Sequence, residues 1–409
     1  MKDISGGVCA PKGFKAGGIW CGIKASSKKR DLGLIYSEKP CVAAAMFTTN
    51  RVKAACVLVS REHLADGKCQ AVIVNSGNAN ACTGEAGLAA ARRMASLAAD
   101  EFALKADNVA VASTGVIGAP FPIAAVESSI GALASSLQGD EAGHEAALEA
   151  IMTTDTRKKA ASVELEINGK IVRIGGMTKG SGMIHPNMAT MLCFVTTDAA
   201  ISRELLDKAL RAAVKHSFNR VTVDGDTSTN DTILVMANGE AANAPISAEG
   251  ADYQLFAEAL EAVCIKLARA MARDGEGATR LVTVTARGAK DEITAETLAK
   301  SVASSSLVKA ACFGADANWG RVLCAMGYSG ADFDPDRTDV YFAGKQGSVL
   351  VYKQGTPVAF SEEEAKKILL EEEIEINIEL AGGAGPGNVT VWGCDLTYDY
   401  VKINGDYRS

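Results

Sequence analysis

The stretch Lys179-Gly180-Ser181-Gly182-Met183-Ile184-His185-Pro186-Asn187-Met188-Ala189-Thr190-Met191-Leu192-Cys193-Phe194-Val195 changes character at one point. As far as Pro186 it is rich in glycine and serine, and its His-Pro pair holds the chain extended, so it predicts a loop. From Met188 onward it is apolar and rich in β-prone residues, which predicts a buried strand. Thr190 stands at this junction, directly after Ala189.

A threonine at this junction has two interpretations. In the first, Thr190 is a β-branched residue that begins a core strand. In the second, cleavage of the Ala189–Thr190 bond turns Thr190 into an amino-terminal nucleophile. Its own α-amine, with an ordinary pKa of about 8, would then serve as the general base. The local sequence does not choose between these two interpretations.

The length, composition and charge of the chain limit the classes of protein to which it can belong. The chain has 409 residues, of which 48% are hydrophobic, so it can bury a large core and has the length of two to three domains. Its net charge of −7 gives no reason to expect nucleic acid as a partner. No apolar run reaches 18 residues, so no membrane span is expected, and no apolar signal core follows Met1. We therefore expect a cytoplasmic protein.

Metal and disulfide chemistry have little support. The eleven cysteines include no C-x-x-C pair, and most stand in apolar surroundings. The four histidines share no metal-ligand spacing: His63, His144, His185 and His216. The polar run at residues 224–231 begins like a calcium loop, but its glycine is misplaced and no glutamate closes it. We predict no metal site.

Strands and helices alternate along the whole chain, which predicts an α/β or α+β fold in one integrated unit. The apolar runs at residues 55–59, 70–74 and 109–112 predict short buried strands, and the last two run into Asn75-Ser76-Gly77-Asn78-Ala79-Asn80 and Ser113-Thr114-Gly115-Val116-Ile117-Gly118. Ser202 predicts a helix start. Apolar residues at helical spacing predict a long helix: Phe256, Leu260, Val263, Leu267 and Met271.

Six stretches together resemble one family, the ornithine acetyltransferases, also called glutamate N-acetyltransferases. The stretch around Thr190 looks like the signature of that family. Five further blocks are similar to family blocks, in family order and over nearly the whole chain: Ala10-Pro11-Lys12-Gly13-Phe14, Phe47-Thr48-Thr49-Asn50-Arg51, the two polar runs that follow residues 74 and 112, and Asp224-Gly225-Asp226-Thr227-Ser228 with Asp231-Thr232. Six matches in order make coincidence implausible.

The resemblance implies a precursor that cleaves itself between Ala189 and Thr190 into an alpha chain, 1–189, and a beta chain, 190–409. The two chains would remain together as one integrated unit with a four-layer α/β/β/α fold. Two such pairs would form a heterotetramer of two alpha and two beta chains.

The implied reaction moves the acetyl group of N2-acetyl-L-ornithine to L-glutamate in arginine biosynthesis. Thr190 would be the nucleophile, and Thr114 and Gly115 would form the oxyanion hole. The expected contacts to the substrate are Thr153, Lys179, Thr190, Glu276, Asn404 and Ser409. Some family members also take the acetyl group from acetyl-CoA, and these residues do not decide whether this chain does. No other cofactor is implied.

The residue types suit this chemistry. Covalent catalysis lets one site serve two amines in turn, and Lys179 can bind the α-carboxylate that both substrates carry. Glu276 can bind the side-chain amine of ornithine. The plainer interpretations are an ordinary turn at Thr114-Gly115 and solvated loop charges at Lys179 and Glu276.

Three other functions are compatible with the fold class. A related amino-terminal-nucleophile aminopeptidase or amidohydrolase would admit water to the acyl-enzyme, and such enzymes typically use serine as the nucleophile. A paralogous acetyltransferase of secondary metabolism would share the motifs. An uncut binding protein would not need Thr190, Thr114 and Lys179, so their presence disfavours it.

Overall fold

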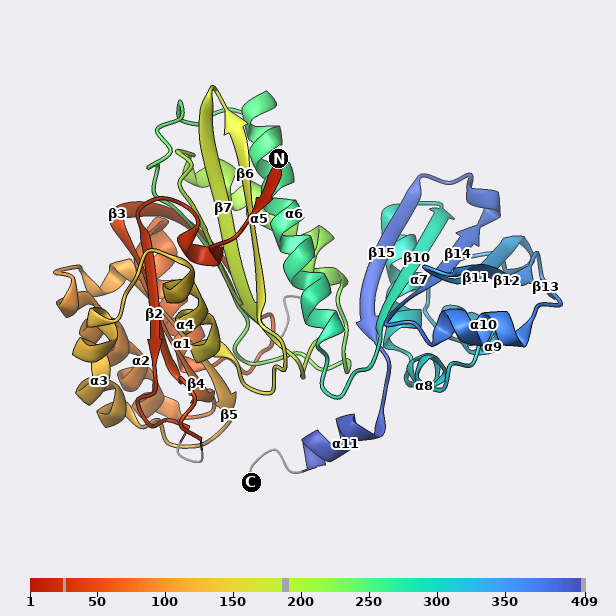
Figure 1. The fold of residues 1–409 in the computed structure, drawn as a ribbon, viewed down its shortest axis with the longest axis horizontal. Helices are drawn as coiled ribbons and strands as arrows, with labels where there is room; N and C mark the ends of the chain where they lie inside the picture. Colours follow the sequence, from red (N-terminus) through yellow and green to blue (C-terminus); the bar gives the residue numbers. More distant parts are fainter. Residues whose placement is uncertain (25–26, 186–190, 406–409) are drawn as a thin grey trace. The chain divides into compact units, whose positions relative to one another are not determined.

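A computed structural model describes residues 1–24, 27–185 and 191–405. The chain forms two compact units (Figure 1). Unit 1 comprises Met1–Gly180, Asn187–Asn219 and Asp226–Leu267, and unit 2 comprises Ser181–Pro186, Arg220–Gly225 and Ala268–Ser409.

One long strand organises unit 1. The described residues of this unit contain a nine-stranded sheet in the order β1-β6-β7-β8-β9-β3-β4-β5, with β2 also paired to β3. The register of β3 against β4 shifts between Tyr36 and Cys41, and residues 42–47 of β3 pair with β9 instead. The first half of β3 pairs with β2 and β4 and its second half pairs with β9, so this long strand runs from one layer of the unit into the other. The strands are β1 (Lys2–Ile4), β2 (Phe14–Ile19), β3 (Leu32–Phe47), β4 (Lys68–Asn78), β5 (Val109–Val116), β6 (Lys159–Ile167), β7 (Lys170–Lys179), β8 (Leu192–Thr197) and β9 (Thr232–Ala237).

The two layers enclose one inner core. Val72 and Val74 from β4 belong to the same buried cluster as Met177 from β7, Phe194 from β8 and Leu234 from β9. Helix α4 (Glu141–Ile151) adds three further apolar side chains to this cluster, namely Ala147, Leu148 and Ile151. The strands therefore face each other as a β/β sandwich.

Helices cover both outer faces of the sandwich, because successive strand residues point to opposite sides. Ile73 and Val111 face outward and pack with α1 (Ala55–His63), α2 (Gly84–Glu101) and α3 (Ile123–Ser135). On the other layer, Gly176 and Val195 lie against Val263 and Leu267 of α6 (Ala251–Arg273). Helix α5 (Arg203–His216) contacts β3. The predicted four-layer α/β/β/α fold is confirmed in unit 1.

One predicted strand is wrong. Residues 55–59 belong to helix α1, whereas residues 70–74 and 109–112 lie in strands β4 and β5 as predicted. The side chains of Ala55, Cys56 and Val59 are buried while Leu58 is 42% exposed, a helical spacing. An apolar run of five residues is too short to separate a strand from a helix by periodicity.

Two further local predictions are confirmed, whereas the first residues of the strand predicted from Met188 lie outside the described residues, and β8 (Leu192–Thr197) is its described part. The side chain of Ser202 accepts a hydrogen bond from the backbone N–H of Leu205 and caps α5. The predicted face of α6 is fully buried: Phe256, Leu260, Val263, Leu267 and Met271.

Unit 2 is a smaller α/β unit. Its described residues hold a six-stranded sheet in the order β13-β12-β11-β14-β10-β15. These strands are β10 (Leu281–Ala289), β11 (Thr338–Gly344), β12 (Gly347–Lys353), β13 (Thr356–Pro357), β14 (Glu373–Leu380) and β15 (Gly387–Cys394). Its helices are α7 (Glu292–Ser304), α8 (Ser306–Gly314), α9 (Trp319–Gly327), α10 (Glu362–Leu369) and α11 (Tyr398–Gly405).

The division into an alpha chain, 1–189, and a beta chain, 190–409, stays a prediction. The two compact units are a different division of the folded chain, in which Met1–Gly180 and Asn187–Asn219 both belong to unit 1. None of the helices described is long and apolar enough to cross a bilayer.

Candidate active site

The predicted site residues fall into three groups. Ala189, Thr190 and Ser409 lie outside the described residues. Thr114, Gly115, Thr153 and Lys179 lie in unit 1, and Glu276 and Asn404 lie in unit 2.

In unit 1, Lys179, which we predicted to bind the α-carboxylate of the substrate, lies next to the predicted oxyanion hole. The Nζ of Lys179, the last residue of β7, donates a hydrogen bond of 3.3 Å to Oγ1 of Thr114 in β5. Lys179 is only 5% exposed, and it pairs with Leu192 at the start of β8. The end of β7 therefore places this cation opposite Leu192, which follows Thr190 by two positions in the sequence.

Close packing of the backbone requires glycine at position 115. Its φ of +133° lies in a region that other residues rarely adopt, and a Cβ here would lie 2.3 Å from the carbonyl carbon of Gly77. Gly115 pairs with Gly77 where β5 meets β4. Thr114-Gly115 is thus the end of a parallel strand and not an ordinary turn.

Asp155, which we did not predict as a site residue, forms hydrogen bonds with the backbone on both sides of this site. Asp155 Oδ1 accepts hydrogen bonds from Lys159 Nζ at 2.6 Å and from the N–H of Gly180 at 2.8 Å. Its Oδ2 accepts the N–H of Thr153 at 2.9 Å. Asp155 therefore fixes the backbone of Thr153, and that of Gly180 next to Lys179.

The charge state of Asp155 follows from its surroundings. Burial raises the pKa of this carboxyl, but the positive charges of Lys179 and Lys159 outweigh the burial and hold the pKa well below its ordinary value. Asp155 is therefore ionised at neutral pH. The sequence contains little that indicates this role of Asp155, because an aspartate in a polar turn with a lysine four residues later suggests a surface ion pair.

A cavity of about 520 Å³ adjoins Thr153 and Asp155. Five cations and one further carboxylate contribute to its lining: Lys24, Lys28, Lys29, Arg30, Lys158 and Glu149. Burial lowers the pKa of Lys24 to about 8, and the nearby charge of Lys179 adds to this effect, while Asp31 opposes it. The positive lining suits an anionic ligand.

In unit 2, Glu276 and Asn404 are brought together. The Nδ2 of Asn404, in α11, donates a hydrogen bond of 2.8 Å to Oε2 of Glu276. The N–H of Glu276 donates to the carbonyl of Ser181 at 2.9 Å, and a Cβ on Gly182 would lie 2.2 Å from Oε2 of Glu276. A side chain at position 182 would therefore displace this carboxylate from its observed position.

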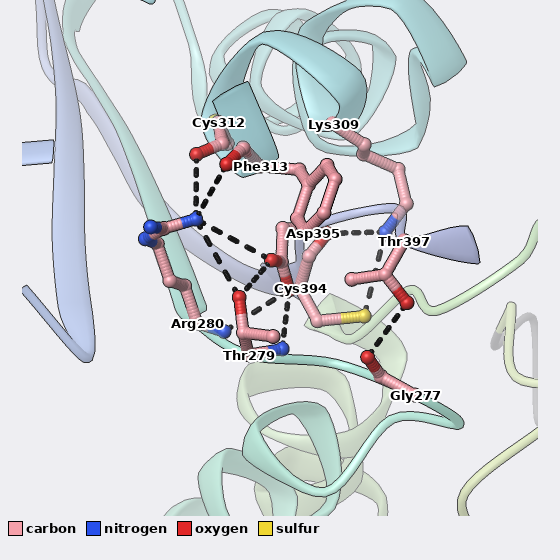
Figure 2. A network of polar contacts seen from close by, with 9 residues as sticks. All are labelled: Gly277, Thr279, Arg280, Lys309, Cys312, Phe313, Cys394, Asp395 and Thr397. Carbon is pink, nitrogen blue, oxygen red and sulfur yellow. Dashed lines mark hydrogen bonds and ion pairs between the residues drawn. The ribbon is translucent and has the colours of Figure 1, made fainter. Parts of the chain in front are cut away.

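A network around Asp395 holds the segments that carry these two residues (Figure 2). Asp395 Oδ1 accepts the N–H groups of Thr279 at 2.8 Å and Arg280 at 3.0 Å. Thr397 Oγ1 donates to the carbonyl of Gly277 at 2.8 Å, directly after Glu276. Buried Lys309 donates to the carbonyl of Cys394. The strand end at β15 is thereby tied to residues 277–280.

Metal ligands do not cluster in the part of the chain that the structure describes: no group of three or more His, Cys, Asp or Glu side chains could hold an ion there.

Comparison with known proteins gives consistent matches. The ArgJ family model matches residues 15–409. The arginine biosynthesis bifunctional protein ArgJ of Symbiobacterium thermophilum is 53% identical over 410 residues, and that of Caldanaerobacter subterraneus subsp. tengcongensis is 51% identical over 409 residues, with all of each chain covered. The solved structure of ornithine acetyltransferase complexed with ornithine from Mycobacterium tuberculosis is 41% identical, with a TM-score of 0.42, over 44% of this chain and 95% of that one.

The buried Asp155 leads to a stability prediction. Asp155→Asn should lower the free energy of unfolding at pH 7 by about 3 kcal/mol or more, because it leaves Lys159 buried without its counter-charge. Since the folded pKa of Asp155 is depressed, its contribution exists above the unfolded pKa of about 3.9 and is lost as the pH falls toward the folded pKa. The difference between the two proteins should therefore shrink below pH about 4.

Chemical denaturation across this pH range measures the effect. Asp207→Asn is the matched control, since Asp207 also pairs with a cation four residues later, Arg211, but both side chains are substantially exposed. The control should cost less than about 1 kcal/mol. Equal losses for the two variants, or a loss that is the same at pH 7 and pH 3, would contradict the assignment.

Proposed function

The chain belongs to the ArgJ family and is an acetyltransferase of arginine biosynthesis; on this basis we propose that it moves the acetyl group of N2-acetyl-L-ornithine to L-glutamate through an acetyl-Thr190 intermediate. The observation that carries this proposal is the contact between Lys179 and Thr114, beside the strand that begins just after Thr190. The full-length matches favour this function over an amino-terminal-nucleophile aminopeptidase, an acetyltransferase of secondary metabolism and an uncut binding protein.

The first half-reaction would load the enzyme. Thr190 Oγ attacks the acetyl carbonyl while the α-amine of Thr190 takes the hydroxyl proton. The tetrahedral intermediate then collapses, the C–N bond breaks, and the proton passes to the departing amine of ornithine. In the second half-reaction the amine of glutamate attacks the ester, and Thr190 Oγ leaves and recovers a proton. Both substrates use one site in turn, and the route needs no metal or other cofactor.

The oxyanion that forms in each half-reaction needs hydrogen-bond donors. Thr114 Oγ1 accepts a hydrogen bond from Lys179, so its own hydroxyl hydrogen is available to donate. With the N–H of Gly115 it would stabilise the negative oxygen, and each such donor is worth about 3 kcal/mol of barrier in known oxyanion holes.

Substrate charges fit the remaining residues. We propose that Lys179 binds the α-carboxylate common to both substrates, and that Glu276 binds the side-chain amine of ornithine. Thr153, Asn404 and Ser409 would complete the contacts. The cation-lined cavity beside Thr153 supports acetyl-CoA as a second acetyl donor, since phosphates suit its charge.

The hydroxyl of Thr190 would also cleave the chain, by attack on the carbonyl of Ala189 and hydrolysis of the resulting ester. The two chains would stay associated, because β8 pairs with β7 from Ile174↔Thr197 to Lys179↔Leu192, and β9 pairs with β3 from Val42↔Ala237 to Phe47↔Thr232. We propose that two such pairs form a heterotetramer, which light scattering can test.

We further propose a cytoplasmic location. All eleven cysteines, every one within the described residues, are free, as is usual in a reducing compartment. Fractionation of the source cells tests this.

Cleavage and transfer should depend on the same hydroxyl. Freshly purified protein should show fragments of 189 and 220 residues (409 minus 189) by intact-mass spectrometry. Thr190→Ala should abolish both cleavage and transfer, whereas Thr190→Ser should keep some of each because its hydroxyl remains. A Thr190→Ala variant with near-normal transfer would remove Thr190 from the mechanism.

Steady-state kinetics should be ping-pong, because the two amines never need to be bound together. Initial rates measured against both N2-acetyl-ornithine and glutamate should give parallel double-reciprocal lines. The same measurement with acetyl-CoA as donor tests the second acetyl source. Intersecting lines would favour direct transfer in a ternary complex.

Glu276→Gln should raise the KM for N2-acetyl-ornithine but not the KM for glutamate. The KM for N2-acetyl-ornithine should rise about tenfold or more, since the negative charge that pairs with the side-chain amine is removed and only a weaker, neutral acceptor remains. The KM for glutamate should not rise, because the variant removes a negative charge that would repel the side-chain carboxylate. Glu363→Gln is the control, since Glu363 is 81% exposed. Equal increases for both substrates would show that Glu276 does not bind the ornithine side chain.

A further inference from the structure

The polar loop before β9 contains none of the residues proposed above to react with or bind the substrate. It includes Thr227, Ser228, Thr229, Asn230 and Asp231, and it belongs to unit 1. From Ser228 to Asp231 its residues are buried, with exposed fractions of 2–7%. Buried polar side chains persist where their hydrogen bonds are satisfied, so the partners of this loop indicate what it does.

Asn230 contacts the strand that carries the predicted oxyanion hole. Its Nδ2 donates hydrogen bonds to the carbonyl of Ser113 at 2.7 Å and to the carbonyl of Ala79 at 2.6 Å. The Ser113 carbonyl belongs to the peptide bond that joins Ser113 to Thr114. A single amide group therefore fixes the peptide plane directly before Thr114, and also the turn that follows β4.

Asp231 contacts the strand that follows the predicted nucleophile. Its Oδ1 accepts the N–H of Met191 at 2.8 Å, and that nitrogen belongs to the peptide bond between Thr190 and Met191. The N–H of Thr232 donates to the carbonyl of Met191 at 3.0 Å. The side chain of Asp231 thus extends the ladder between β8 and β9 by one more hydrogen bond.

The loop itself is held by residues 48–54. The N–H of Thr48 donates to the carbonyl of Asp231 at 3.0 Å, and its Oγ1 donates to the carbonyl of Ser228 at 2.7 Å. Asn50 Nδ2 donates to the carbonyl of Thr227 at 2.9 Å, and Ala54 N–H donates to that of Thr229 at 2.9 Å. These contacts leave Asn230 and Asp231 little freedom to move relative to the sheet.

We infer that Asn230 and Asp231 are a pair of positioning residues for acyl transfer, which together fix the spacing between the backbone before Thr114 and the backbone after Thr190. This inference rests on the proposed function. The two residues are adjacent in sequence, so a rigid two-residue unit connects the two strand ends. Misplacement of reacting groups by about 1 Å can cost about 100-fold in rate.

The hydrogen bond from the Met191 N–H to Asp231 does not require an ionised carboxylate. Burial raises the pKa of Asp231 well above its ordinary value, although the Met191 N–H, the Thr48 hydroxyl and the charge of Lys179 act in the opposite direction. A neutral carboxyl group still offers its carbonyl oxygen to the N–H of Met191.

The first test exchanges an amide for a carboxyl group of the same shape. Asn230→Asp removes the donor that two carbonyls share. Asn238→Asp is the matched control, because Asn238 follows the other end of β9 and its Nδ2 donates to the carbonyl of Lys12 and to Ser37 Oγ. We expect Asn230→Asp to lower kcat for acetyl transfer about 100-fold, with KM changed less than about threefold. The control should keep kcat within about twofold.

The second test does not depend on the folding of Asn230→Asp. Asp231→Ala should lower kcat about 100-fold and slow self-cleavage, whereas Asp231→Asn, which retains an oxygen acceptor for Met191 N–H, should lose less than about tenfold. Thermal midpoints of all variants identify losses that are due only to unfolding.

The inference is overturned if folded Asn230→Asp behaves like Asn238→Asp, or if its KM rises while kcat is unchanged. Equal losses in Asp231→Asn and Asp231→Ala would also overturn it, since they would show that the carboxyl group acts by something other than accepting the Met191 N–H. If the unaltered protein transfers no acetyl group from N2-acetyl-ornithine to glutamate, the proposed function fails instead.

Discussion

The pairing of β8 with β7 on one side and with β9 on the other is the constraint on which the site in unit 1 depends. Leu192 at the start of β8 pairs with Lys179 of β7 on one side and with Thr232 of β9 on the other. Groups at the ends of β7 and β9 are therefore placed by backbone hydrogen bonds, relative to the residues that follow Thr190. Such placement is more precise than placement by long side chains on mobile loops.

Strand β8 is buried on both of its faces. Leu192 and Phe194 contribute to the core between the two layers, and Val195 on the opposite face lies against α6 by way of Gly176. Because both faces of β8 are buried and apolar, the hydrophobic pattern alone would not prevent a slip of the strand by one residue. The hydrogen bonds of Asp155, Asn230 and Asp231 favour the observed register, because each of these side chains would lose its partners if the strands moved by one residue.

The electrostatics follow from the same burial. Lys179, Lys159 and Asp155 are nearly or fully removed from solvent, so their mutual interactions are weakly screened. Asp155 compensates part of the positive charge and anchors the backbone of Gly180. Lys179 is thereby held at Thr114 as a desolvated cation, and a carboxylate that reaches it would gain more than at an exposed lysine.

Much of this arrangement could be predicted from the sequence, and the failures have physical causes. The strand after Thr190, the cap at Ser202 and the buried face of α6 follow from local patterns that persist over enough residues. Residues 55–59 were too few to show a period. Asp155 and Asn230 could not be identified as structural centres, because their partners, such as Gly180 and Ser113, are far away in sequence and are backbone groups that leave no mark on residue type. The family resemblance supplied the candidate residues of the proposed reaction, but not the groups that hydrogen-bond to the backbone beside them.

The fold also limits when the proposed cleavage can take place. Strands β7 and β8 lie on opposite sides of the Ala189–Thr190 bond and are paired in one sheet, and the inner core combines Val72 and Met177 from before the bond with Phe194 and Leu234 from after it. Neither piece alone could complete this core, because each would expose one apolar face of its strands to water. The proposed cleavage would therefore have to follow folding of the intact chain. After it, the same buried area and backbone hydrogen bonds would hold the pieces together, so Thr190 would gain a free amine while the surrounding strands keep their pairing.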